Sequence, residues 1–140
     1  MEGVCLWEKE VIDFHSALAQ WLGAVNSVPE KALLERLKES FTEQCRLFSP
    51  NGEIHSAAAL RARIESSYGS SPDISIRISD FSVIHQNAPL TLVSYTEWRT
   101  EKGHENARLA SVVFIDALES AAGVRWLHIH ETWKKGFEPR

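Results

Sequence analysis

The stretch that decides the fold is Val124–Trp133, which reads Val-Arg-Trp-Leu-His-Ile-His-Glu-Thr-Trp. Successive side chains of a strand point to opposite faces. One face of this strand would carry Trp126, His128, His130 and Thr132, and the other would carry Leu127, Ile129 and Trp133. An apolar face opposite a face with imidazoles and an indole is typical of a pocket wall. The pattern therefore predicts a closing strand that lines a pocket.

Length and charge limit the possible functions. The 140 residues suit one domain over residues 1–140. A net charge of -4 argues against binding to nucleic acid or to an acidic membrane. No segment approaches membrane-span length, and Met1–Val4 shows no secretory leader. Cys5 and Cys45 lack metal-type spacing, so we expect reduced thiols in a cytoplasmic protein.

The first half of the chain has helical spacing of its apolar residues. It predicts helices over Asp13–Val25, Glu30–Glu39 and Ala57–Tyr68, the last with Ser56 as N-cap. Between them, Phe41–Phe48 reads as a short strand. It ends at the turn residues Ser49–Gly52, after which Glu53–His55 can pair back.

From Asp73 the apolar period changes to two, which predicts strands. The first of them runs to His85 with a bulge at Asp80. Two more follow over Leu90–Thr100 and Glu105–Asp116, joined by a hairpin at Glu101–His104, before the closing strand. Helices followed by antiparallel strands indicate an α+β fold.

The order of elements, the Phe-Ser-Pro-Asn-Gly turn at 48–52 and the ending Trp-x-x-x-His-Glu-x-Trp resemble the nuclear-transport-factor-two-like (cone) superfamily. Within that superfamily the chain is similar to SnoaL-like domains of unknown function and to the association domain of calcium/calmodulin-dependent kinase. The resemblance implies a strongly curved sheet that wraps N-terminal helices around a cavity, with the other sheet face supporting a homodimer. Members include isomerases, dehydratases, polyketide cyclases, ligand binders and assembly domains. The resemblance therefore predicts the fold more firmly than the function.

A register estimate predicts which side chains share the cavity face. A tight hairpin at 101–104 places Glu97 opposite Arg108 and Tyr95 opposite Ala110. If the next hairpin closes near residues 117–123, Ala110 lies near His130 and Val112 near His128. The opposite face would then carry the dimer contacts, including Trp98, Ile129 and Trp133.

This face holds the candidate site residues. His130 and Glu97 are the acid–base candidates, because an imidazole titrates near neutrality and burial raises the pKa of a carboxyl group. Arg108 is a candidate anchor for a ligand carboxylate. The remaining ligand-binding candidates are Tyr95, Trp21, Phe14, Trp126 and His128. A purely structural role remains open for each, and we expect His15 on the outer flank of its helix, near solvent.

Metal and cofactor sites are weakly indicated. His128 and His130 could hold a metal with Glu97, but no further Cys or His completes a shell, so we expect none. No phosphate-binding loop or dinucleotide fingerprint occurs, so we expect no nucleotide cofactor.

Three functions remain open. The first is a pocket protein that binds an apolar and possibly carboxylated small molecule, with Arg108 as anchor. The second is an isomerase-, dehydratase- or cyclase-type enzyme that uses His130 or Glu97 as acid or base. The third is a dimerisation or assembly module.

Overall fold

The computed structural model describes residues 4–24 and 29–139, and its elements follow the predicted order. The helices are α1 (Leu6–Leu22), α2 (Lys31–Lys38) and α3 (Ala57–Ser66). The strands are β1 (Phe41–Phe48), β2 (Ile54–Ser56), β3 (Ser75–Asn87), β4 (Leu90–Glu101), β5 (His104–Asp116) and β6 (Val124–Trp133). Helix α1 begins seven residues earlier than predicted, and its predicted last residue, Val25, lies outside the described residues.

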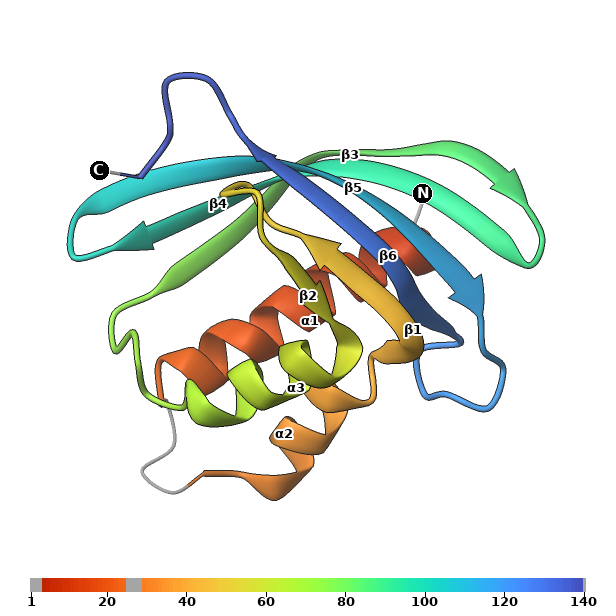
Figure 1. Ribbon diagram of the computed structural model, residues 1–140, viewed down its shortest axis with the longest axis horizontal. Coiled ribbons are helices and arrows are strands. Elements are labelled where there is room, and N and C mark those ends of the chain that lie inside the picture. The colour runs from red at the N-terminus through yellow and green to blue at the C-terminus, as the bar shows by residue number, and fades with distance from the viewer. Residues whose placement is uncertain (1–3, 25–28, 140) are drawn as a thin grey trace.

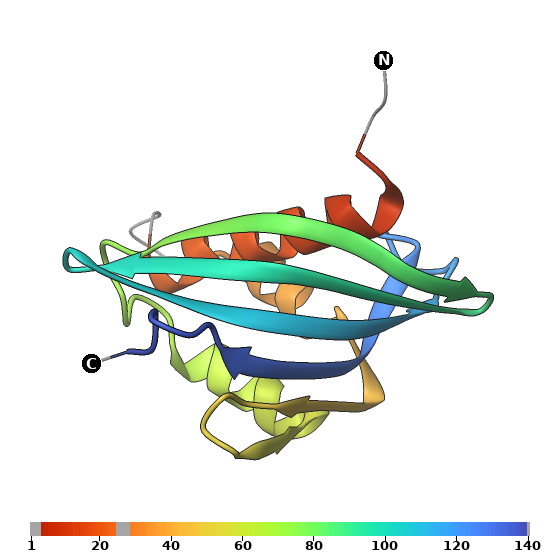
Figure 2. The same cartoon turned by 90° about the horizontal axis from the view of Figure 1, so that it is seen from above.

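The six strands form one curved sheet in the order β2-β1-β6-β5-β4-β3; α1 and α3 lie against its concave face, and α2 packs against these two helices (Figure 1). Seen from above, the long strands lie side by side, with α1 running beneath β3 and β4 (Figure 2). The strands pair antiparallel except for β1 and β6, which are parallel. This arrangement confirms the predicted α+β cone. Within the described chain, no helix is long and apolar enough to cross a membrane.

Local sequence signals account for several of the element boundaries. The Ser56 hydroxyl accepts a hydrogen bond from the Ala59 N–H, as expected of an N-cap. Lys102 and Gly103 both have positive φ, as a two-residue hairpin turn of this hand requires, so Glu101 pairs directly with His104. Asp80 also has positive φ, at the predicted irregularity of β3.

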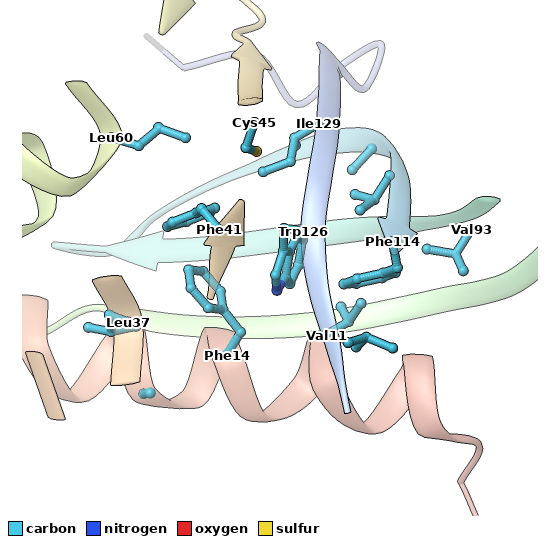
Figure 3. Packing of buried hydrophobic residues seen from close by; sticks show 14 of the residues in the cluster. Val11, Phe14, Leu37, Phe41, Cys45, Leu60, Val93, Phe114, Trp126 and Ile129 are labelled. Carbon is cyan, nitrogen blue, oxygen red and sulfur yellow. The ribbon is translucent and has the colours of Figure 1, made fainter. Parts of the chain in front are cut away.

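The core lies between α1 and the inner face of the sheet. Phe14 of α1 points toward Phe41 and Trp126, and the Trp126 ring also packs against Phe114 (Figure 3). Leu37 of α2 is fully buried beside them. Because the sheet is curved, its inner face also borders a cavity, which Phe14, Phe41 and Trp126 help to line.

Candidate functional site

A cavity of about 340 Å³ lies between the inner face of the sheet, α1, α3 and the turn that joins β1 to β2. One side of it is apolar, formed by Phe14, Leu18, Phe41, Leu60, Ile64 and Ile129. The side formed by the sheet is polar and carries Tyr95, Glu97, Arg99, Arg108 and Glu131, with His15 reaching it from α1. The cavity is therefore amphipathic.

The predicted register between β4 and β5 is confirmed. Glu97 is the partner of Arg108, and Tyr95 is the partner of Ala110. Both Glu97 and Tyr95 are buried on the face that meets the helices. The tight turn at Lys102 and Gly103 sets this register, which is why the sequence alone predicts it.

The predicted register between β5 and β6 was wrong by one residue. Ala110 pairs with Glu131 rather than His130, and Val112 pairs with Ile129 rather than His128. Between Val113 and Phe114 the pairing shifts, so β6 carries one extra residue, Leu127, after Trp126. A one-residue shift moves every later side chain to the opposite face of the sheet.

His128 and His130 therefore lie on the outer face, against the ring of Phe48 and away from the cavity. His130 is exposed, so its predicted place as an acid–base residue in the pocket is corrected, as is the ligand-binding place of His128. They also lie on the other side of the sheet from Glu97, so the three cannot share a metal ion. Among the described residues, no cluster of His, Cys, Asp or Glu is arranged to hold one.

Five of the other candidates do line the cavity: Phe14, Tyr95, Glu97, Arg108 and Trp126. Trp21 lies outside it, where its indole N–H donates to the Ile64 carbonyl at 2.6 Å. Ile129 and Trp133, predicted on the dimer face, instead face inward. The Trp133 ring covers the Arg108 guanidinium at 4.8 Å.

His15 is a site residue that the sequence reasoning missed. It is only 5% exposed, and its Nε2 lies 3.1 Å from Oε1 of Glu97. Its Nδ1 lies 2.7 Å from the Val11 carbonyl oxygen, which can only accept, so Nδ1 is the donor there. The contact with Glu97 is then favourable only when a proton lies between Nε2 and Oε1. The signal was available, because His15 follows Val11 by four residues and precedes Leu22 by seven, on the buried stripe of α1.

Glu97 is held by cations on two sides. Burial opposes its charge, but Arg99 and His15 outweigh that effect and hold the pKa of Glu97 well below its usual range. The Arg99 Nε donates to Glu97 Oε2 at 2.5 Å. A carboxylate with a lowered pKa is a weak base, so these contacts do not favour the predicted acid–base role of Glu97.

Glu131 is the second buried carboxyl group of the pocket, and its pKa is shifted in the opposite direction from that of Glu97. Burial, together with the charge of Glu97, raises the pKa of Glu131 above its ordinary value, and Arg108 only partly offsets this. The Arg108 Nη1 donates to Glu131 Oε1 at 3.2 Å. Burial and the two neighbouring glutamates also raise the pKa of Tyr95, which keeps its phenol protonated. Of the two buried carboxyl groups in the pocket, Glu97 is thus firmly ionised and Glu131 gains a proton more easily.

Arg108 is held between the pocket and its mouth. Its Nε is buried and has no hydrogen-bond partner among the residues that the structure describes. The stacked Trp133 donates from its indole N–H to the Asn51 side chain at 3.2 Å, which ties the end of β6 to the turn after β1. The guanidinium is therefore held in a fixed position, and its Nε–H has no acceptor among the described residues.

The curved sheet, wrapped around the N-terminal helices beside a pocket, has the cone fold of NTF2-like proteins. Residues 7–135 match the family model described as sucrose-6-phosphate phosphohydrolase C-terminal, so the chain belongs to that family. No curated protein matches the chain.

Solved structures share this fold. An NTF2-like protein of unknown function from Pseudomonas aeruginosa is 24% identical, with a TM-score of 0.84 over 93% of this chain and 99% of that one. The CaMKII hub of S. rosetta is 11% identical, with a TM-score of 0.64 over 90% of this chain and 95% of that one. A putative aromatic ring hydroxylase from Novosphingobium aromaticivorans is 12% identical, with a TM-score of 0.58 over 88% and 85% of the two chains. At these identities the likeness shows the fold alone.

Proposed function

We propose that this protein binds a small amphipathic organic anion, with the carboxylate of the ligand on Arg108 and its apolar body against α1 and α3. The observation that carries the proposal is the buried Arg108 Nε, which has no hydrogen-bond partner among the described residues. A buried donor without a partner costs about 1–3 kcal/mol, and more when the group is charged. A ligand carboxylate across the free edge of the guanidinium would satisfy Nε in a two-pronged contact.

The distribution of charge supports an anion. Glu97 is already matched by Arg99 and His15. Arg108 is matched by Glu131, whose raised pKa weakens its hold on the negative charge. Glu131 therefore competes less strongly with an anionic ligand for Arg108 than a carboxylate of ordinary pKa would.

The rest of the cavity favours an apolar ligand body. Phe14, Leu60 and Ile64 form a continuous apolar wall opposite the charged side. The family description names an enzyme whose substrate, sucrose 6-phosphate, is also an anion. A phosphate would contact a guanidinium as a carboxylate does, but a sugar would leave the apolar wall without a partner, so we favour an apolar carboxylate.

Calorimetric titration tests this proposal with 3-phenylpropanoate, hexanoate, the matching alcohols and sucrose 6-phosphate. We expect the carboxylates to bind more tightly than the alcohols. Removal of a hydrogen bond to a charged group costs about 1.5–3 kcal/mol, so Arg108→Ala should weaken carboxylate binding by about 10- to 150-fold. Arg108→Lys, which keeps the charge but loses the two-pronged geometry, should show an intermediate loss.

Arg77→Ala is the matched control, because Arg77 lies on the outer face over the Trp98 ring and should leave binding unchanged. Equal affinity of the wild type and Arg108→Ala for the carboxylates would contradict the proposal. Alcohols that bind as tightly as carboxylates would contradict it too, and tight binding of sucrose 6-phosphate alone would replace the carboxylate with a sugar phosphate.

We also propose that two copies associate through the outer face of the sheet. Leu109 is 41% exposed there, and the half-buried Val113 lies on the same face further along β5. Trp98, the predicted centre of the interface, is covered within its own chain by Arg77 and Phe137, so Leu109 is the better anchor. The likeness to an assembly hub supports association but not its geometry.

Light scattering on a sizing column tests this association. We expect a dimer for the wild type and a monomer for Leu109→Glu, because a buried unpaired charge opposes an apolar interface. Leu118→Glu is the control, since Leu118 is 92% exposed in the loop before β6. A monomeric wild type, or a dimer that survives Leu109→Glu, would show that this face is not the interface.

A further inference from the structure

We propose that Glu131 binds the ligand in its protonated form, so that an organic carboxylate enters the pocket together with one proton. This inference rests on the proposed function and adds to it a specificity-determining residue and a dependence on pH. It is independent of His130, the residue that the sequence pattern favours for acid–base chemistry.

Glu131 on β6 and Arg108 on β5 are diagonal neighbours on the inner face, because Glu131 pairs with Ala110 and Arg108 with Trp133. The small Ala110 side chain lies opposite Glu131 and leaves its carboxylate able to reach Arg108 Nη1, 3.2 Å away. Glu131 is only 7% exposed, so water screens this contact little.

Several charged groups face Glu131. From β4, Glu97 and Arg99 face the same pocket and are paired with each other, although the charge of Arg99 also acts on Glu131. From α1, His15 is paired with Glu97, and from α3, Arg63 lines the cavity with a positive charge and hydrogen-bonds to His55. Tyr95 and, from the turn after β1, Glu53 also line the cavity and add no positive charge. Because Arg108 contacts Glu131 directly, it is the guanidinium that Glu131 and a ligand carboxylate would share.

An anionic ligand would add a second carboxylate beside Arg108. Two carboxylates that share one guanidinium in a buried site cannot both stay ionised without a large cost, because like charges at close range raise the pKa of one of them. Glu97 is held ionised by two cations, whereas Glu131 already has a raised pKa. Glu131 is therefore the group that takes up the proton.

Once Glu131 is protonated, it no longer competes with the ligand carboxylate for Arg108 and can form a hydrogen bond with it. Its O–H can donate to the ligand carboxylate while Arg108 donates from Nε, so both oxygens of the ligand are satisfied. The proton comes from solvent and returns there when the ligand leaves. Ligand affinity should therefore rise as pH falls, as long as the ligand itself remains ionised.

Calorimetry with 3-phenylpropanoate between pH 6 and pH 8, in two buffers of different ionisation heat, measures this coupling directly. For the wild type we expect uptake of up to one proton per ligand and an affinity that falls by up to tenfold for each pH unit. Glu131→Gln imitates the neutral carboxyl group and should fold. It should bind with no proton uptake and with an affinity independent of pH.

Glu105→Gln on the exposed start of β5 is the control and should keep the wild-type coupling. If the wild type and Glu131→Gln bind with the same pH dependence and the same proton uptake, this inference is wrong while the proposed function stands. If neither binds a carboxylate at any pH, the proposed function fails and this inference fails with it.

Discussion

Arg99→Met is expected to lower the free energy of unfolding by about 3–5 kcal/mol, the usual cost of leaving one member of a buried ion pair without its partner. Glu97 is only 1% exposed, and Arg99 donates to one of its two carboxylate oxygens. With Arg99 removed, His15 and the more distant Arg108 would remain to offset the charge of Glu97. Urea unfolding followed by circular dichroism measures the loss.

The pH dependence of this loss follows from the lowered pKa of Glu97. A lowered folded-state pKa contributes stability above the ordinary value of 4.5, and that contribution is lost as pH falls through the folded-state value. The difference between the wild type and Arg99→Met should therefore shrink when the measurement is repeated below pH 4.5. A difference that grows toward acid would contradict the assigned ion pair.

Two variants separate the charge effect from a packing effect. The double variant Glu97→Leu with Arg99→Met removes both charges and should recover much of the lost stability. Arg77→Met removes an exposed guanidinium 3.9 Å from Glu105 on the outer face and should cost at most about 1 kcal/mol. A double variant as unstable as the sum of its parts would show that Arg99 acts mainly through packing.

Trp126→Ala should also cost about 3–5 kcal/mol, because it opens a large cavity at the centre of the core. Trp126 is 1% exposed, and its ring centroid lies 5.0 Å from that of Phe14 and 4.7 Å from that of Phe114. Its indole N–H also donates to the buried Glu10 carboxylate at 2.9 Å, so the substitution removes a partner from that group. Chemical unfolding followed by circular dichroism again measures the effect.

Trp126→Phe separates the two contributions. It keeps an aromatic ring in the core and removes the N–H donor, and it should cost less because Arg36 still pairs with Glu10. Trp133→Ala at the mouth of the pocket is the control. It should cost less again, because this ring is only partly buried and its stacking on Arg108 is worth about 0.5–1 kcal/mol. Equal losses for Trp126→Ala and Trp133→Ala would contradict the assignment of Trp126 to the core.

The site could be predicted only where local signals set its geometry. Glu97 and Arg108 lie one on each side of a two-residue turn, so counting outward from Lys102 and Gly103 was sufficient to pair them. α1 starts seven residues before the predicted helix, so its first turns, which include Val11, lay outside the predicted range. Val11 and His15 share one buried stripe, and without those turns the buried face of the helix was predicted too narrow to include His15. Glu131 was missed because the register of β6 was wrong.

The sequence by itself determined the elements, their order and the pairing of β4 with β5, because periodicity, caps and tight turns act over a few neighbouring residues. Only the tertiary structure decided which face of Val124–Trp133 meets the pocket. That choice depends on the extra residue Leu127 and on parallel pairing with β1, about 80 residues earlier in the chain. Because strand side chains alternate with a period of two, this single residue moved the histidines outward and brought Glu131 to Arg108.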